Sequence, residues 1–350
     1  MHFLSKIMLL TGAFAFGPLP ALSQSLSEGS DAAQSGDYVT ALENFEPLAE
    51  QGNVYAQFNL GNMYSTGEGV PQNYSTAVEW YRKAAEQGLA HAQFNLGNIY
   101  RTGEGVPQNA STAVEWIRKA AEQGLARAQL ELGNMYNNGE GVLQNASTAV
   151  EWFRKAAEQG VASAQYNLGS MYSTGEGVPK NYSKAVEWYR KAAEQGDASA
   201  QFNLALMYDS GEGVPQNYSK AVEWFRKAAE QGMASAQLNI GNMYNNGEGV
   251  PQSYSKAVRW YRKAAEQGAA KAQFNLGNMY DTGEGVSRNP VMAYVVNNLA
   301  AAQGHESARN NRDIIANDLS REQIAEGQRM ASEWRVGAPL PYLKDFNTWP

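Results

Sequence analysis

The chain contains no cysteine and only three histidines among its 350 residues. Without thiols it can form neither a disulfide framework nor a lipoprotein anchor, and cysteine-based zinc sites are excluded. The histidines, His2, His91 and His305, are spread over the whole chain, so they cannot gather into a metal site or supply a nucleophile–histidine pair. We therefore expect no metal, no cofactor and no catalytic centre, and the chain is predicted not to be an enzyme.

Clustered basic charge is also missing. The formal net charge is −7, and no stretch is rich in Lys and Arg. A protein that binds nucleic acid needs a basic patch to neutralise phosphates, so nucleic acid is not expected as a partner. Charges of both signs alternate along much of the chain instead, which is typical of solvent-exposed helical surfaces.

The N-terminal segment has a short apolar run from Ile7 to Phe16, which is too short to span a bilayer. Lys6 precedes this run, and Ala21 and Ser23 place small residues at the −3 and −1 positions of a cleavage site. We predict that residues 1–23 are a signal peptide. The chain would then be exported, periplasmic or secreted, without stable insertion in the membrane after the segment is removed.

A unit of 36 residues repeats seven times from Asn53 to Gly304 without a change of register. A unit of this length is usually one supersecondary element that buries its apolar face only by stacking on its neighbours. We predict an all-α protein, a right-handed α-solenoid of helix-turn-helix repeats. The dipeptide Gln-Gly closes every unit, at residues 87–88, 123–124, 159–160, 195–196, 231–232, 267–268 and 303–304.

The first half of each unit is predicted to form a helix, helix A, which covers Val54 to Thr66 in the first unit. Its apolar side chains have the i, i+4, i+7, i+8 spacing of an amphipathic helix. Gly67 follows where a left-handed C-terminal cap favours glycine. Gly61 lies inside the helix, where glycine costs about 1 kcal/mol relative to alanine. Because five other units keep this glycine, we expect a neighbouring helix to approach it closely.

The second half is predicted to form helix B, with Asn73 as its N-cap and its end near Gln87. Glu79 and Lys83 are expected to form an exposed i,i+4 pair. The buried side of the helix is predicted to consist of Ala77, Val78, Trp80, Tyr81, Ala84 and Ala85.

Degenerate or capping segments are predicted at both ends of the repeats. Residues 35–52 match the second half of a unit, with Asp37 as an N-cap, and residues 24–52 are predicted to be a degenerate N-terminal capping repeat. Residues 305–336 are predicted to hold two C-terminal capping helices, the second opened by a capping box of Ser320 and Gln323. Residues 337–350 form a tail, which we expect to fold back because it carries Tyr342, Leu343, Phe346 and Trp349.

Three repeated residue types have a functional and a structural interpretation. The Glu of each Gly-Glu-Gly turn resembles a carboxylate array, but a turn residue at one edge of the solenoid is the favoured interpretation. The Asn-x-Ser sequons that begin several B helices are favoured as N-caps, with glycan attachment as the alternative. The tryptophans at equivalent positions of helix B are interpreted as core residues rather than as a stacking platform: Trp80, Trp116, Trp152, Trp188, Trp224 and Trp260.

The unit resembles the Sel-one-like repeat, a relative of the tetratricopeptide repeat. The resemblance covers all seven units; in the seventh, Val296 departs from it at the Trp position. The matching residues of the first unit are Ala56, Leu60, Gly61, Tyr64, Gly67, Gly69, Val70, Asn73, Ala77, Trp80, Tyr81, Ala84, Ala85 and Gly88.

The resemblance implies a non-catalytic scaffold that binds a protein or peptide partner through the concave face lined by helix A. Exported bacterial relatives suggest a periplasmic regulator or a host-interaction factor. The alternative is a cell-envelope enzyme acting on peptidoglycan or β-lactams, an activity linked to disulfide-rich relatives, from which the lack of cysteine separates this chain. Variable positions give the face a weak gradient, basic at Arg101 and Arg127 and acidic at Asp209 and Asp281. The residues implied to contact the partner are Tyr55, Phe58, Asn62, His91, Phe94, Asn98, Arg101, Arg127 and Asn134.

Overall fold

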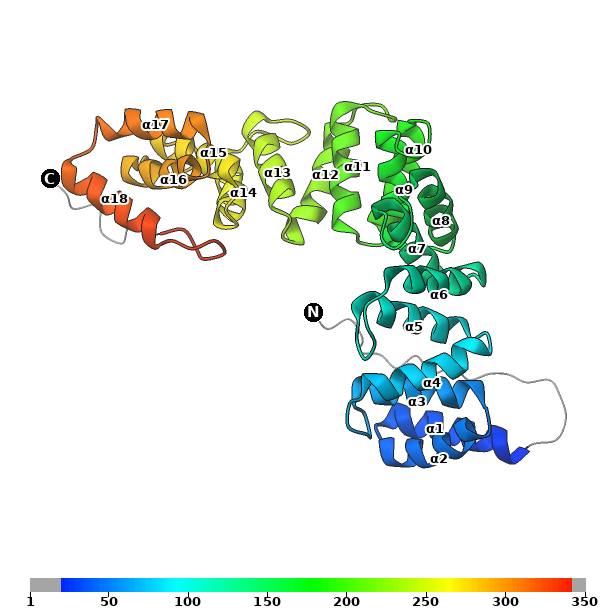
Figure 1. The fold of residues 1–350 in the computed structure, drawn as a ribbon. Coiled ribbons are helices and arrows are strands. Elements are labelled where there is room, and N and C mark those ends of the chain that lie inside the picture. Colours follow the sequence, from blue (N-terminus) through cyan, green and yellow to red (C-terminus); the bar gives the residue numbers. More distant parts are fainter. Residues whose placement is uncertain (1–19, 342–350) are drawn as a thin grey trace. The chain divides into compact units, whose positions relative to one another are not determined.

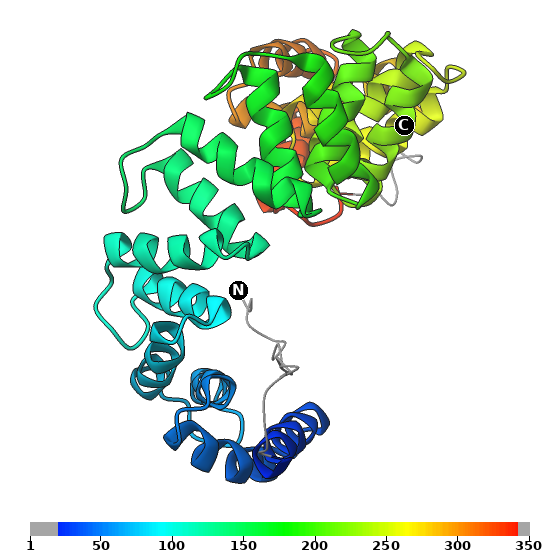
Figure 2. The same cartoon turned by 90° about the vertical axis from the view of Figure 1, so that its right-hand side faces the viewer.

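The computed structural model describes residues 20–341, which form eighteen helices and no strand. They fall into two compact units that divide between Lys180 and Asn181. Within each unit, successive helices lie against one another, except that the last helix, α18, lies against α16 rather than α17 (Figure 1 and Figure 2). The first unit holds α1 (Pro20–Ser35), α2 (Tyr38–Glu50), α3 (Val54–Thr66), α4 (Tyr74–Glu86), α5 (Ala90–Thr102), α6 (Ala110–Glu122), α7 (Ala126–Asn138), α8 (Ala146–Glu158) and α9 (Ala162–Thr174).

The second unit continues the same alternation and ends in two further helices. It holds α10 (Tyr182–Glu194), α11 (Ala198–Ser210), α12 (Tyr218–Glu230), α13 (Ala234–Asn246), α14 (Tyr254–Glu266), α15 (Ala270–Thr282), α16 (Pro290–Ala302), α17 (Glu306–Ala316) and α18 (Arg321–Glu333). The predicted all-α repeat architecture is therefore confirmed.

The predicted ends of both repeat helices are confirmed, and each end has a local cause. Gly67 caps helix A with φ of 80°, a left-handed conformation that favours glycine. The Asn73 carboxamide accepts a hydrogen bond from the Thr76 N–H at 3.1 Å and so begins helix B. The same cap recurs at Asn109, Asn145, Asn181, Asn217 and Asn289, which supports the capping interpretation of these residues.

The glycine inside helix A is explained by close packing, as predicted. A Cβ atom at Gly61 would lie 2.6 Å from the ring of Tyr81 in the paired helix B. Tyr81 is itself buried among Ala77, Val78 and Ala84, so the ring has no room to move away. The glycine thus allows a large aromatic ring to fill the space between helix A and helix B.

The repeated tryptophans are not fully buried, and this prediction was wrong. All six are half-buried. Trp80 packs on the apolar cluster of the preceding helices, and the Lys83 Nζ lies 3.8 Å from the centroid of its ring. Each of the other five tryptophans has a lysine three residues later, and the Nζ of this lysine lies 3.9 to 4.6 Å from the centroid of the tryptophan ring. Lys83 therefore makes a cation–π contact with Trp80 where an ion pair with Glu79 was expected.

The Gly-Glu-Gly turn of each repeat packs on the preceding repeat. A Cβ atom at Gly105 would meet the backbone of Tyr74 and Ser75 at 2.6 to 2.8 Å, and its φ is 75°. The Ser75 hydroxyl donates a hydrogen bond to the Gly105 carbonyl at 3.3 Å. The turn therefore joins adjacent repeats at one edge of the stack, in agreement with its structural interpretation.

The N-terminal end holds a helix pair, α1 and α2. Asp37 accepts the Thr40 N–H at 3.2 Å and caps α2, as predicted. The α1 helix begins at Pro20, so the predicted end of the signal peptide at residue 23 lies within it. Most of the signal prediction, residues 1–19, lies outside the described part of the chain.

At the C-terminal end, the two predicted helices, α17 and α18, and the Ser320–Gln323 capping box are confirmed, and both helices pack on α16. The start of the tail folds back on α14: the Gly337 N–H donates to the Glu266 carbonyl at 2.7 Å, and the Leu340 N–H donates to the Glu266 carboxylate at 3.1 Å. The four large apolar residues expected to drive this contact, Tyr342, Leu343, Phe346 and Trp349, lie outside the described residues. Among residues 20–341, no helix is long and apolar enough to cross a membrane.

Candidate interaction surface on the A helices

We call the side of each A helix that lies opposite its apolar core stripe (Ala56, Leu60 and Met63 in α3) the helix A face. In α3 it comprises Tyr55, Phe58, Asn59, Asn62 and Ser65, and in the later A helices the residues at 36-residue intervals from these. This face exists because Ala56, Leu60 and Met63 direct the opposite side of the helix into the core.

Asparagine side chains join neighbouring A helices along this face. In the first unit, the Asn95 amide donates to the Asn62 carbonyl oxygen at 3.5 Å, and the Asn167 amide donates to that of Asn134 at 3.4 Å. In the second unit, the corresponding bonds are Asn275 to Asn242 at 3.2 Å and Asn311 to Asn278 at 2.8 Å. We call this array the asparagine ladder. It places carboxamides in register on successive helices.

Helix B tyrosines fix two of these carboxamides. The Tyr81 hydroxyl donates to Asn62 at 2.7 Å, and the Tyr261 hydroxyl donates to Asn242 at 2.9 Å. Burial raises the pKa of both Tyr81 and Tyr261 to about 12. Both hydroxyls therefore stay protonated at physiological pH and keep the asparagine oxygens oriented.

Substitutions at three positions interrupt the ladder: Glu131, Ser170 and Leu206. Glu131 stands where other repeats have asparagine, and its carboxylate lies 3.4 Å from the Arg101 guanidinium. Leu206 replaces the accepting asparagine in α11 and is 37% exposed. The Asn239 amide, which loses this partner, donates to the Ser235 carbonyl at 2.9 Å instead.

The nine predicted contact residues all lie on α3, α5 and α7 of the first unit, but they are not equally accessible. Phe58 is 3% exposed and packs against the Tyr81 ring at a centroid distance of 5.9 Å, so its side chain belongs to the core. Asn62 is 8% exposed. Arg127 is exposed, and the remaining six are half-buried: Tyr55, His91, Phe94, Asn98, Arg101 and Asn134.

The basic end of the predicted gradient is weaker than the sequence suggests. Arg101 is paired with Glu131. Burial and then the nearby charge of Arg127 lower the pKa of His91, which keeps its imidazole neutral at physiological pH. The charge of Arg127 is therefore the main basic feature that the predicted residues present.

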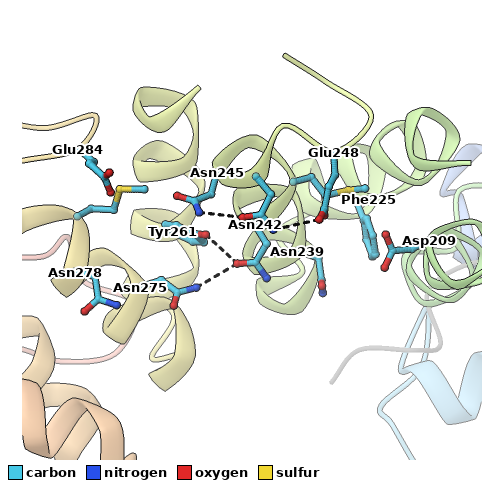
Figure 3. Close-up of a pocket in the computed structure, with 13 residues that line it drawn as sticks. Asp209, Phe225, Asn239, Asn242, Asn245, Glu248, Tyr261, Asn275, Asn278 and Glu284 are labelled. Atoms are coloured by element: carbon cyan, nitrogen blue, oxygen red, sulfur yellow. Dashed lines mark hydrogen bonds between the residues drawn. The ribbon is translucent and has the colours of Figure 1, made fainter. Parts of the chain in front are cut away.

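A pocket of about 520 Å³ lies on the helix A face of the second unit (Figure 3). It is bounded by the C-terminal halves of α11, α13 and α15 and by the Gly-Glu-Gly turns after α13 and α15. Its lining residues are Asp209, Phe225, Asn239, Asn242, Met243, Asn245, Asn246, Glu248, Tyr261, Asn275, Asn278, Met279 and Glu284.

The sequence predictions did not identify this pocket. Asp209 was expected only to form part of a charge gradient. The available signal was the coincidence of a variable acidic position with the repeated asparagines on the same helix face. Within the described residues, no group of three or more His, Asp or Glu side chains could hold a metal ion.

Comparison with known proteins places the chain among repeat proteins. The model of the Sel1 repeat matches eight segments, residues 21–53, 54–89, 90–125, 126–161, 162–197, 198–233, 234–268 and 270–305. The first segment corresponds to the helix pair α1–α2, so the segment predicted to be a degenerate capping repeat is an eighth repeat. The comparison with curated proteins finds no match.

Several solved structures resemble the chain. A Sel1 repeat protein from Oxalobacter formigenes is 36% identical, with a TM-score of 0.62, and the match covers 67% of this chain and 97% of that one. The protein c5321, a protective antigen present in uropathogenic Escherichia coli strains, is 31% identical over 89% of this chain and 91% of its own, with a TM-score of 0.39. The immunity protein Pa5087 from Pseudomonas aeruginosa is 25% identical over 61% of this chain and 83% of its own, with a TM-score of 0.36. The eight matched segments cover most of the chain, which therefore belongs to the Sel1-repeat family.

Proposed function

We propose that the chain is a non-catalytic, exported scaffold that binds a protein or peptide through the helix A face, as a periplasmic regulator or a host-interaction factor. The asparagine ladder is the observation that carries this proposal. Each carboxamide has two donor hydrogens and an acceptor oxygen, and a ladder bond uses one donor of one residue and one acceptor site of the next. In the half-buried members of the ladder, such as Asn278, the remaining donor hydrogens can reach a partner.

A peptide in an extended conformation would suit this arrangement. Its backbone presents N–H and C=O groups at a spacing of about 3.3 Å per residue, and such groups need no particular side chain for recognition. Neighbouring packed helices lie about 8–10 Å apart, so three or four A helices match roughly nine extended residues. A stable interface of about 800 Å² on each partner would need additional side-chain contacts.

Photo-crosslinking in cells tests the proposal directly. A photo-reactive amino acid placed at Asn98 or Arg127 on the helix A face is expected to form discrete crosslinks to the partner. The same amino acid at the exposed Glu115 or Glu151 on helix B serves as the matched control. Equal crosslinking from helix A and helix B positions, or from neither, would contradict the assignment of the binding face.

A further inference from the structure

The second unit has a helix face that combines carboxylates, carboxamides and an exposed leucine. Asp209 lies at one end of the pocket, followed by Phe225 and Glu248, and Asn275, Asn278 and Glu284 lie toward the other end (Figure 3). Leu206 is three residues before Asp209 on α11, so both side chains lie on the same side of that helix.

We propose that the helix A face of α11, α13 and α15 docks an extended basic segment of a partner protein, with an arginine or lysine side chain in the pocket between Asp209 and Glu248. This inference rests on the proposed function and specifies the chemistry of the partner. It differs from the sequence expectation, which directed attention to the first unit.

Charge complementarity is the first argument. The pocket lining includes Asp209, Glu248 and Glu284 but no lysine or arginine. None of the three carboxylates forms an ion pair within the described residues. In the first unit, by contrast, the Glu131 carboxylate on the same face is paired with Arg101. The pocket lining thus contains no cation to pair with its carboxylates.

The pKa of Asp209 also supports the binding of a cation in this pocket. Partial burial raises the pKa of its carboxyl group, and the neighbouring charge of Glu248 raises it further. Both effects disfavour the ionised carboxylate in the free protein. A cation bound between Asp209 and Glu248 would offset both effects, and binding should therefore be accompanied by a fall in the pKa of Asp209.

The neutral residues favour a peptide over a free cation. Arginine and lysine carry apolar stems that bury along apolar surface while the charge stays with polar groups, and Leu206 provides such a surface next to Asp209. Asn242, Asn275 and Asn278 offer carboxamides along the rest of the pocket. These amides can bond to the peptide backbone on either side of the basic residue.

Fluorescence anisotropy with the purified chain tests the proposal. The probe is a labelled peptide of about nine residues, which extends over roughly 30 Å, with two arginines in an alanine-, leucine- and glycine-containing background. We expect this peptide to bind about tenfold more tightly than the version with glutamine at both positions, and the version with glutamate to bind more weakly still. Binding of the arginine peptide should weaken as salt rises from about 0.05 M to about 0.5 M.

Matched variants test whether the preference for arginine comes from Asp209 and Glu248. Asp209→Asn with Glu248→Gln should remove most of the preference for arginine. The control, Glu187→Gln with Glu223→Gln, makes the same change in net charge on the exposed surface of helix B in the same unit and should leave binding within about twofold. Equal weakening by both pairs would show general charge attraction and would overturn the proposal.

Two further outcomes separate this inference from the proposed function. If arginine and glutamine peptides bind equally and Asn242→Ala weakens both, the face binds peptides but the basic preference is wrong. If spermidine competes for the pocket as effectively as the arginine peptide, the site takes free cations, and the docking of a protein segment is refuted. Absence of binding by every peptide also refutes this inference, whereas crosslinking from Asn98 and Arg127 still decides the proposed function.

Discussion

Asn297 is a buried polar residue whose hydrogen bonding is incomplete. It lies in α16 at the position that Tyr81, Ile117 and Tyr261 occupy in other B helices, and its side chain is 0% exposed. Its amide donates to the Ala293 carbonyl within the helix at 2.9 Å, but its carbonyl oxygen has no partner within the described residues. An unpaired buried polar group of this kind costs about 1–3 kcal/mol.

Replacing this residue should stabilise the C-terminal repeats. We expect Asn297→Ile to raise the free energy of unfolding by about 1 kcal/mol, because it removes the unpaired oxygen. Ile117 already fits opposite Gly97, as this side chain would opposite Gly277. Urea unfolding monitored by circular dichroism would measure the change, with Asn297→Asp as a control that should lower stability. A lower midpoint for Asn297→Ile would indicate that the oxygen is satisfied by an ordered water.

His91 provides a pH-dependent contribution of known sign. Burial and then Arg127 lower its pKa from the ordinary value of 6.5. At a pH between the two pKa values, the imidazole is therefore more often protonated in the unfolded chain than in the folded one. The stability that the neutral His91 contributes is fully present above about pH 6.5, and it is lost as the pH falls through the pKa of the folded state. Arg127→Ser should raise the pKa of His91, measured by NMR titration of the imidazole. Lys271→Ser, at the equivalent position of the second unit, should leave it unchanged, and a fall in the pKa after Arg127→Ser would contradict the assignment.

At the residue level, sequence reasoning succeeded where one short-range cause decides the outcome. The Asn73 cap and the left-handed Gly67 depend only on neighbouring backbone groups, and both were predicted. It failed for Trp80, because the apolar stripe of helix B is too wide for every member to be buried. The edge of that stripe meets solvent, and Lys83 covers it.

At the scale of the repeat, glutamines link three successive helices. The Gln129 amide donates to the Ala121 carbonyl at the end of α6 at 3.1 Å, and its oxygen accepts the Gln159 amide from the end of α8 at 2.7 Å. Gln159 also donates to the Gly124 carbonyl at 3.0 Å. The arrangement recurs in both units and gives carbonyls at the helix ends an additional donor; the Ala121 carbonyl also accepts the Gly124 N–H at 3.0 Å. Repetition of Gln-Gly in the sequence therefore reflects a structural requirement of stacking.

Removing the inner glutamine should uncouple neighbouring repeats. We expect Gln129→Leu to lower the free energy of unfolding by about 1–3 kcal/mol, because the Ala121 carbonyl and the Gln159 amide both lose a partner. The exposed Gln159→Leu should cost less, and the double variant should cost less than the sum of the two single changes. A double-mutant cycle by urea unfolding measures this coupling. Strict additivity would show that the two side chains act independently.

Sites that combine several repeats were the least predictable part of the molecule. The pocket of the second unit brings together Asp209, Asn242 and Asn278, which stand on three different helices. Each residue has an ordinary role when one repeat is considered alone. Only their stacking places a carboxylate without an internal cation beside half-buried carboxamides. This placement depends on interhelical distances that the sequence pattern does not specify.

At the scale of the whole molecule, stacking of like units makes every repeat depend on its neighbours. In such an array, stability is approximately a sum of repeat and nearest-neighbour terms, and the end repeats need a partner or a polar cap. The first repeat contributes Leu26 and Ala33 of α1 to the core shared with α2 and α3. The C-terminal end is covered by α18, whose Gly327 and Met330 are buried.

Export is the property of the whole chain that remains a prediction, and it can be tested without disturbing the repeats. Cleavage after Ser23 would remove only the first turn of α1 and would retain Leu26 and Ala33 in the core. We expect the wild-type chain to appear outside the cytoplasm with a mass that lacks residues 1–23. Leu9→Asp with Leu10→Asp should leave the full-length chain in the cytoplasm, because a charged segment no longer acts as the apolar part of a signal peptide.

The matched control is Leu9→Val with Leu10→Val, which keeps the segment apolar and should be exported normally. Cell fractionation with intact-mass measurement distinguishes the forms. Full-length wild-type protein confined to the cytoplasm would refute export. It would also change where the partner should be sought, because the binding segment inferred for the second unit would then have to come from a cytoplasmic protein.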